Sequence, residues 1–134
     1  MTHKIKIICP QCKEEKEVWI HSRAKFCSYQ CSADNKYSIF IEEWKQNLVE
    51  GSYPNHKNSV NKRVIKYFKE NVHNCSECGI GKTWNDKPLV LEIDHIDGDR
   101  SNNYYSNLRY ICPNCHSQTD TFRAKNIKKR GPIV

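Results

Sequence analysis

The chain lacks any long apolar run, and apolar side chains make up only 37% of its 134 residues. No segment is therefore expected to cross a membrane, and the short basic stretch from Met1 to Ile8 does not resemble a secretory signal. The mean hydropathy of −0.83 also excludes a large hydrophobic core. Small domains with so few apolar residues often need metal ions or disulfides to hold together.

Acidic residues are also fewer than basic ones: the chain has 15 aspartates and glutamates and 22 lysines and arginines, which gives a formal charge of +7. The acids of the last third gather between Asp94 and Asp99, and a basic tail follows that contains Arg123, Lys125, Lys128, Lys129 and Arg130. A basic protein around a small acidic pocket suits a polyanion bound beside a metal ion. A surface kept soluble by its charge explains the same totals equally well.

Cysteine is the residue type that the chain has in plenty. Its 8 cysteines form four close pairs: Cys9 with Cys12, Cys27 with Cys31, Cys75 with Cys78, and Cys112 with Cys115. Disulfide frameworks rarely come as four close pairs, so the pattern favours metal binding in a reducing cytoplasm. We expect two structural zinc ions, each held by two pairs in a closed four-thiolate site.

The spacing of apolar residues divides the chain into segments. We expect an N-terminal four-cysteine zinc finger at 1–35, in which Phe26-Cys27-Ser28 leads into a helix that carries Cys31. Residues 36–74 are predicted to form a helical linker, with one helix from Tyr37 to Leu48 and another from Val60 to Phe68. Residues 75–125 form the third segment and 126–134 the basic tail.

The third segment combines zinc ligands with polar residues that zinc does not need. We expect a strand at 88–93, a loop from Asp97, a strand at 108–111 and a helix that begins at Pro113. This hairpin lies between the two cysteine pairs, so the zinc site should bring Asp94-His95 close to the start of that helix. Asp94 and His116 are then candidate ligands of a second, catalytic metal ion.

Three runs of the third segment together resemble the HNH endonuclease family in its zinc-stabilised ββα-metal form. They are Leu91-Glu92-Ile93-Asp94-His95-Ile96-Asp97-Gly98, then Ser106-Asn107-Leu108-Arg109, then Cys112-Pro113-Asn114-Cys115-His116. The preceding finger and helices more loosely resemble phage-borne HNH enzymes, including homing types. The resemblance implies a small α+β protein, located in the host cytoplasm if it is phage-encoded.

The resemblance also implies a function and roles for particular residues. The chain would be a metal-dependent DNA endonuclease that leaves 5′-phosphate and 3′-hydroxyl ends, and a monomer is favoured over a dimer. His95 would be the general base, and Asn107 would orient the loop that carries it. Asp94 and His116 would hold one divalent cation, Mg²⁺ or Mn²⁺, although Asn103 or Asn114 could compete as a ligand.

The same resemblance points to double-stranded DNA as the partner and leaves recognition to basic residues outside the motif. We expect phosphate contacts from Arg100 and Arg109 beside the metal ion. Further contacts are expected from the second linker helix and the tail, through Lys62, Arg63, Lys66, Lys69, Arg123, Lys125, Lys128, Lys129 and Arg130.

Two other interpretations of the motifs remain. Cys112-Pro113-Asn114-Cys115-His116 matches the pattern of c-type haem attachment, which the partner pair at Cys75 and Cys78 disfavours. A non-catalytic zinc-ribbon DNA-binding module would need only basic charge and two zinc sites. Unlike an HNH endonuclease, such a module would not need His95, Asn107 or His116.

Overall fold

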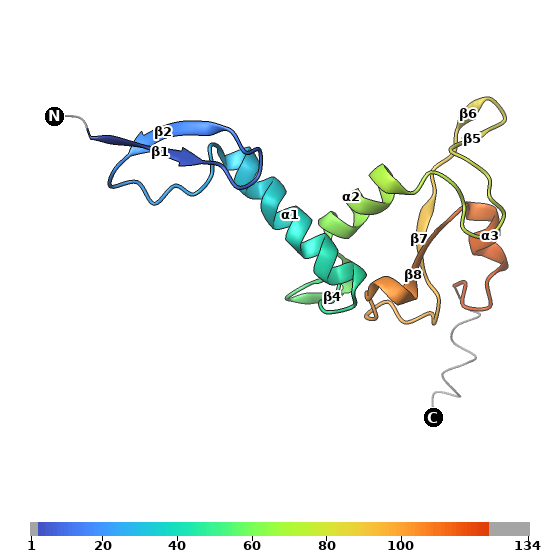
Figure 1. The fold of residues 1–134 in the computed structure, drawn as a ribbon. Coiled ribbons are helices and arrows are strands. Elements are labelled where there is room, and N and C mark those ends of the chain that lie inside the picture. The colour runs from blue at the N-terminus through green and yellow to red at the C-terminus, as the bar shows by residue number, and fades with distance from the viewer. Residues whose placement is uncertain (1–2, 124–134) are drawn as a thin grey trace. The chain divides into compact units, whose positions relative to one another are not determined.

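The computed structural model describes residues 3–123 of the chain, which form a small mixed α+β protein of the class predicted (Figure 1). Two compact units are present, Met1–Glu42 and Glu43–Val134. Each unit contains one group of four cysteines. Within residues 3–123, no helix is both long enough and apolar enough to span a membrane.

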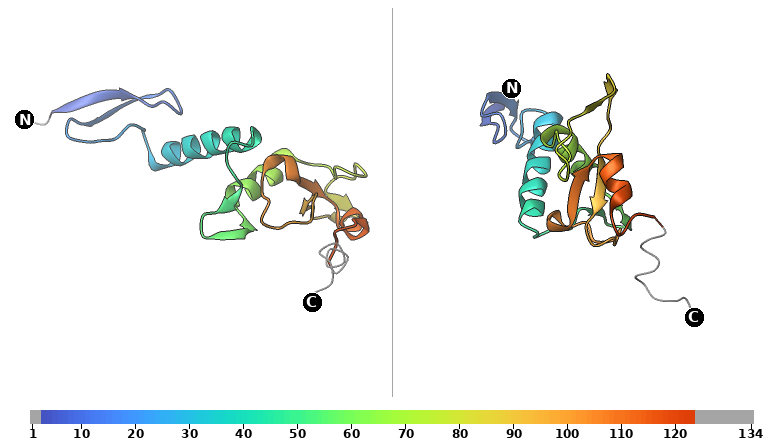
Figure 2. Two further views of the ribbon diagram at one scale, coloured as in Figure 1. Left: turned by 90° about the horizontal axis from the view of Figure 1, so that it is seen from below. Right: turned by 90° about the vertical axis from the view of Figure 1, so that its right-hand side faces the viewer.

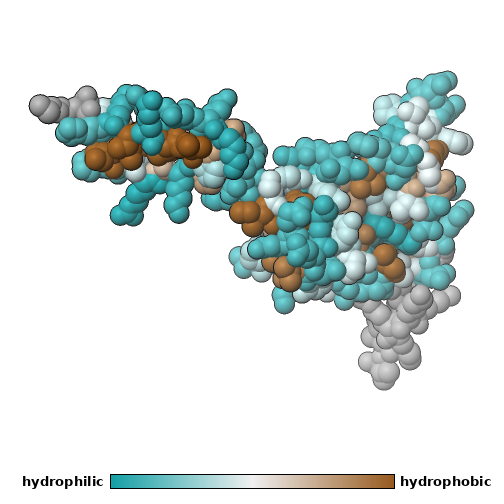
Figure 3. Space-filling model, viewed as in Figure 1, coloured by the Kyte–Doolittle hydropathy of each residue, from teal (hydrophilic) through white to brown (hydrophobic). Residues whose placement is uncertain are grey.

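The first unit contains a hairpin and most of the helix that follows it, and the last residues of this helix belong to the second unit. Strands β1 (Lys4–Ile8) and β2 (Glu15–Trp19) pair antiparallel, and α1 (Tyr29–Lys45) begins directly after Phe26-Cys27-Ser28, as predicted. Apolar side chains lie exposed along the hairpin, among them Ile8 at 69% and Trp19 at 53% (Figure 3). Because the hairpin buries so little, its cysteine group is what can hold this unit together.

The second unit contains the remaining elements, which form three short hairpins, two helices and a single-turn helix (Figure 2). In chain order they are β3 (Ser52–Tyr53), β4 (His56–Val60), α2 (Lys62–Asn71), β5 (Thr83–Trp84), β6 (Lys87–Pro88), β7 (Glu92–His95), the 3₁₀ helix η1 (Tyr105–Asn107), β8 (Leu108–Ile111) and α3 (Pro113–Gln118). The pairs are β3 with β4, β5 with β6, and β7 with β8.

Aromatic rings fill the core of the second unit. Trp44 is fully buried and meets Tyr67, Phe68 and Tyr105 edge-on, with ring centroids 5.0 to 5.9 Å apart. Helix α2 buries Phe68 and Val64 in this core and leaves its lysines outside, as its helical spacing predicts. The core therefore fixes α2 against the segment that leads into β8.

Two predictions about the linker were wrong in detail. Helix α1 ends at Lys45, and Leu48 lies beyond it with 69% of its surface exposed. Val60 ends strand β4 instead of beginning a helix, because Asn61 caps α2 by accepting a hydrogen bond from the Arg63 N–H at 2.9 Å. The β3–β4 hairpin was not foreseen, since its strands are short and polar.

The strand expected at 88–93 is also placed differently. Pro88 ends β6, and β7 begins only at Glu92. The register pairs Glu92 with Ile111 and His95 with Leu108, so the partner strand sets the length of β7. The second predicted strand, Leu108–Ile111, and the helix that begins at Pro113 are confirmed.

Both cysteine groups have the geometry of metal-binding sites. In each group the four Sγ atoms lie within 4.8 Å of one another. Burial raises the pKa of Cys75, but the backbone N–H groups of Cys78, Cys112 and Glu77 outweigh that effect and lower it to about 6. By contrast, the sulfurs of Cys78 and Cys112 raise the pKa of Cys115 to about 12. Four thiolates so close together therefore need a cation to balance their charge.

Candidate active site

The β7–β8 hairpin and α3 position the polar residues that the motif singled out. Asp94 and His95 are the last two residues of β7, and both line the cleft described below. Helix α3 packs on β7 and has Cys112 as its N-cap, whose Sγ accepts from the Cys115 N–H at 3.4 Å. The cysteine group thus fixes the start of the helix, and His116 follows in its first turn.

Asp94 and His116 meet in the structure as the sequence predicted. Asp94 Oδ1 lies 3.4 Å from His116 Nε2, although the two residues come from different elements. Only 4% of the Asp94 surface is exposed. A carboxylate oxygen and an imidazole nitrogen that face each other are a donor set that suits a divalent cation.

The second oxygen of Asp94 is held by Arg109, which faces it across the hairpin. Arg109 Nε donates to Asp94 Oδ2 at 2.7 Å, and its Nη1 donates to Glu77 Oε1 at 2.7 Å. Glu77 lies between Cys75 and Cys78 of the second cysteine group. Arg109 therefore links the second cysteine group to Asp94 and leaves Oδ1 facing His116.

Glu92 orients His116 in the way that Arg109 orients Asp94. Glu92 Oε2 lies 2.6 Å from His116 Nδ1. An ionised carboxylate only accepts hydrogen bonds, so Nδ1 carries the proton and Nε2 keeps its lone pair toward Asp94. A carboxylate behind a ligating histidine is a common way of fixing the tautomer that binds a metal ion.

The loop after His95 is tied down by Asn107. The Asp97 N–H donates to Asn107 Oδ1 at 3.1 Å, and Asn107 Nδ2 donates to Asp97 Oδ1 at 2.8 Å and to the Asn102 carbonyl at 2.9 Å. Partial burial raises the pKa of Asp97, but hydrogen bonds from the Asp99 N–H, Asn102 and Asn107 outweigh it and hold this pKa below its usual value. The ionised carboxylate therefore stays available to hold the loop closed.

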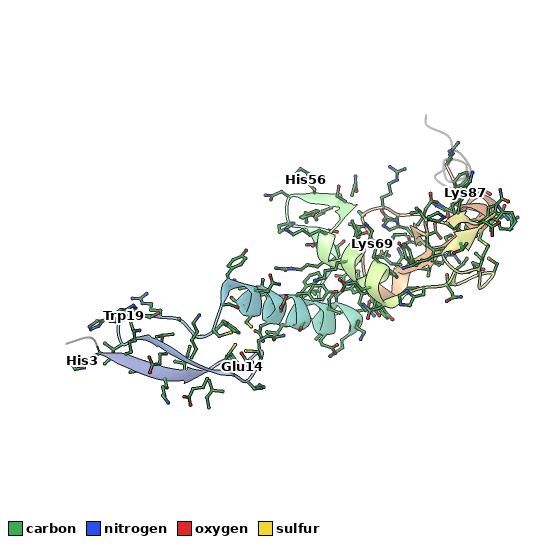
Figure 4. All side chains as sticks on the ribbon, turned by 90° about the horizontal axis from the view of Figure 1, so that it is seen from above. His3, Glu14, Trp19, His56, Lys69 and Lys87 are labelled. Carbon is green, nitrogen blue, oxygen red and sulfur yellow. The ribbon has the colours of Figure 1, made fainter. Side chains whose placement is uncertain are left out.

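These residues surround an open cleft of about 800 Å³. Its lining includes Asp94, His95, His116 and Arg100. The lining also includes Asn58 from β4, whose hairpin carries the labelled His56 (Figure 4). The cleft is thus open to a large substrate and has both acidic and basic groups within it.

Most of the other predicted site residues lie outside the cleft. Arg109 is engaged with two carboxylates and does not line the cleft, and Asn107 lies behind the loop. Asn114 lines a separate apolar cavity beside Trp84, and Asn103 is buried with its side chain against His95. Neither asparagine therefore reaches Asp94 and His116 as the competing metal ligand considered from the sequence.

The basic residues expected to contact DNA lie on α2 and at the end of the described residues. Helix α2 carries Lys62, Arg63, Lys66 and Lys69, and Figure 4 shows Lys69 on this helix. Arg123 lines the cleft at the end of the described residues, and Lys125, Lys128, Lys129 and Arg130 lie outside them.

Sequence reasoning missed Glu92 and Asn58, and it gave Arg109 a different role. Glu92 is two residues before Asp94 on a strand, so both side chains lie on one face, and this spacing could have revealed it. The contact of Arg109 with Asp94 depends on the strand register, which no local pattern specifies. No feature of the sequence pointed to Asn58, because its hairpin is distant in sequence from the HNH motif.

A β-hairpin followed by a helix, with an aspartate and two histidines gathered at their junction, defines a ββα-metal domain. Residues 84–117 match the model of the HNH endonuclease family. The chain is 40% identical over 94 residues to the H-N-H endonuclease F-TflIV of Escherichia phage T5. That match covers 70% of this chain and 38% of the relative, so the chain spans well under half of the relative's length. No solved structure matches.

The chain therefore carries a domain of the HNH endonuclease family, and the resemblance seen in its motifs is confirmed.

Proposed function

We propose that this protein is a metal-dependent endonuclease that hydrolyses phosphodiester bonds of double-stranded DNA as a monomer. The observation that carries the proposal is the meeting of Asp94 and His116 at 3.4 Å in the cleft that His95 also lines. The family match, and the name of the phage T5 relative, support nuclease chemistry. The cysteine groups are assigned to two structural zinc ions, since four thiolates are the usual closed ligand set of zinc.

The residues of the cleft suggest how the reaction proceeds. Asp94 and His116 would hold Mg²⁺ or Mn²⁺, which supplies positive charge for the scissile phosphate and the leaving 3′-oxygen. His95 accepts a proton from the attacking water, whose oxygen bonds to phosphorus as the bond to the 3′-oxygen breaks. The leaving 3′-oxygen takes a proton from solvent water, so the products are 5′-phosphate and 3′-hydroxyl ends.

The other side chains act by orienting these groups. Arg109 fixes the carboxylate of Asp94, Glu92 fixes the imidazole of His116, and Asn107 holds the loop that follows His95. Catalytic groups held by such hydrogen bonds need little rearrangement at the moment of reaction. A module that only binds DNA would not need its side chains oriented in this way.

A supercoiled plasmid incubated with the zinc-loaded protein tests the proposal. With Mg²⁺ or Mn²⁺ we expect nicked or linear DNA that carries 5′-phosphate ends, and with EDTA added after zinc loading we expect a much slower reaction. A shift of the plasmid in a gel without any strand break, with either ion and excess protein, would instead support the zinc-ribbon binding module.

The basic residues should divide into two groups in binding assays. Arg100→Gln, or Lys62→Ala with Lys69→Ala, should remove phosphate contacts, because these side chains are exposed. The slope of log affinity against log salt should become shallower by about 0.9 for each phosphate that is no longer neutralised. Arg109→Gln should instead leave that slope unchanged and raise the divalent-ion concentration needed for half-maximal cleavage, because Arg109 orients Asp94.

The comparison is decisive because all these variants remove positive charge. A change in salt slope for Arg109→Gln, with unchanged metal dependence, would return Arg109 to the phosphate contact predicted from sequence. Unchanged slopes for the Arg100 variant and for the α2 double variant would mean that these side chains merely solvate the surface.

A further inference from the structure

Asn103 is a buried polar residue that the proposed mechanism does not use. None of its surface is exposed, yet every polar atom of its side chain has a partner. Its Oδ1 lies 2.7 Å from His95 Nε2. Polar groups buried so completely are costly unless their hydrogen bonds are made, so this contact is part of a closed network.

The surroundings of Asn103 determine which way its amide group points. Nδ2 donates to Ser52 Oγ at 2.8 Å, to the Lys57 carbonyl at 3.0 Å and to the Arg100 carbonyl at 3.1 Å. Carbonyl oxygens only accept hydrogen bonds. A flipped amide would set Oδ1 against both carbonyls, so Nδ2 must face them and Oδ1 must face His95.

This orientation determines the tautomer of His95. Because Oδ1 can only accept, His95 Nε2 must carry the hydrogen and donate it. In neutral imidazole the lone pair then lies on Nδ1, the other ring nitrogen. The atom of His95 that is able to accept a proton is therefore Nδ1.

We infer that Asn103 is a positioning residue, which holds His95 as the Nε2–H tautomer so that Nδ1 accepts the proton from water. The inference rests on the endonuclease function proposed above and assigns to Asn103 a role separate from that of Asn107. Asn107 ties the loop to its own ends, whereas Asn103 contacts the imidazole itself.

Asn103 is itself held by residues about fifty positions earlier in the chain. Its backbone carbonyl accepts from the Gly51 N–H and from Trp44 Nε1, both at 2.9 Å. A Cβ at Gly51 would lie 2.7 Å from that carbonyl oxygen, so the approach requires glycine. The β3–β4 hairpin, which supplies Ser52 and Lys57, thereby fixes the base through Asn103.

The ¹⁵N NMR spectrum of the full-length, zinc-loaded protein with labelled histidine tests the inference without any DNA. The two tautomers of a neutral imidazole have different ¹⁵N shifts, and the spectrum is recorded at about pH 8.5, where free histidine is neutral. The signal of His95 is assigned by its loss in His95→Ala. We expect the Nε2–H form in the wild type, and an Nδ1–H form there would overturn the inference.

Two variants test the consequence for catalysis. Asn103→Ala should give a mixture of tautomers and lower kcat by roughly 10- to 100-fold with little change in KM, as for other outer hydrogen-bond partners. Asn103→Asp keeps an oxygen acceptor for Nε2–H and should keep the wild-type tautomer, but it sets its second oxygen against the Lys57 and Arg100 carbonyls and should therefore lower stability. A folded Asn103→Ala protein with the wild-type tautomer, or with the wild-type kcat, would refute the positioning role.

The two proposals can fail separately. If the spectrum shows the Nε2–H tautomer but no condition gives cleavage, the hydrogen bond stands and the endonuclease proposal fails. If cleavage occurs but His95 is the Nδ1–H tautomer, the endonuclease proposal stands and the role of Asn103 fails. Should Asn103→Ala not fold, the tautomer seen in the wild-type spectrum still decides.

Discussion

Replacing His95 with alanine is expected to lower the rate of DNA cleavage by about 10²- to 10⁴-fold, the usual contribution of a general base. The affinity for DNA should stay within about twofold, because a base acts on the transition state and contributes little to ground-state binding. The Asp94–His116 pair does not include His95, so the divalent-ion requirement of the residual activity should also be retained.

His73→Ala is the matched control for this experiment. His73 is exposed, lies in the same unit and does not line the cleft, so its loss should leave the rate unchanged. Both variants should melt at similar temperatures and carry the same zinc content. A His95→Ala protein that cuts at nearly the wild-type rate would show that the base is another group.

The largest effect on stability is expected for Cys112→Ala. Only 3% of the Cys112 surface is exposed. The residue belongs to the second cysteine group and is the N-cap of α3. Structural zinc contributes about 10–16 kcal/mol in zinc-finger peptides, which is comparable to or larger than the roughly 5–15 kcal/mol stability of a whole domain. The second unit should therefore fail to fold, and zinc content should fall by about one ion per chain.

Cys12→Ala separates this effect from the loss of zinc in general. Cys12 belongs to the first cysteine group, so its replacement should also cost about one zinc ion but leave the second unit folded. The buried Trp44 reports on that unit, and its fluorescence should shift to the red only in Cys112→Ala. If Cys112→Ala kept both the zinc and a buried Trp44, the second cysteine group would not be a zinc site.

Several parts of this protein could be predicted because neighbouring residues determine them. The close cysteine pairs indicated two metal sites, and in the structure each set of four sulfurs converges within 4.8 Å. Pro113 after Cys112 marked the first turn of α3, since proline is well suited to that position. The order of residues in the HNH motif then indicated the family and identified Asp94, His95 and His116 as candidate site residues.

The contacts that orient these residues could not be predicted in the same way. Arg109 meets Asp94 because of the β7–β8 register, and Asn103 meets His95 while it is held by a hairpin that the sequence did not reveal. A shift of one residue in register would move Arg109 to the opposite face, yet no local pattern near it sets that register.

The sequence by itself thus determined the candidate ligands, the chemical groups of the candidate site and the family, because these depend on residue type and short spacing. Only the tertiary structure showed which oxygen of Asp94 faces His116, which nitrogen of His95 faces Asn103, and that Glu92 contacts His116. Those choices depend on hydrogen bonds between segments distant in the chain. Such contacts form only when packing around Trp44 and the second cysteine group repays the entropy of bringing these segments together.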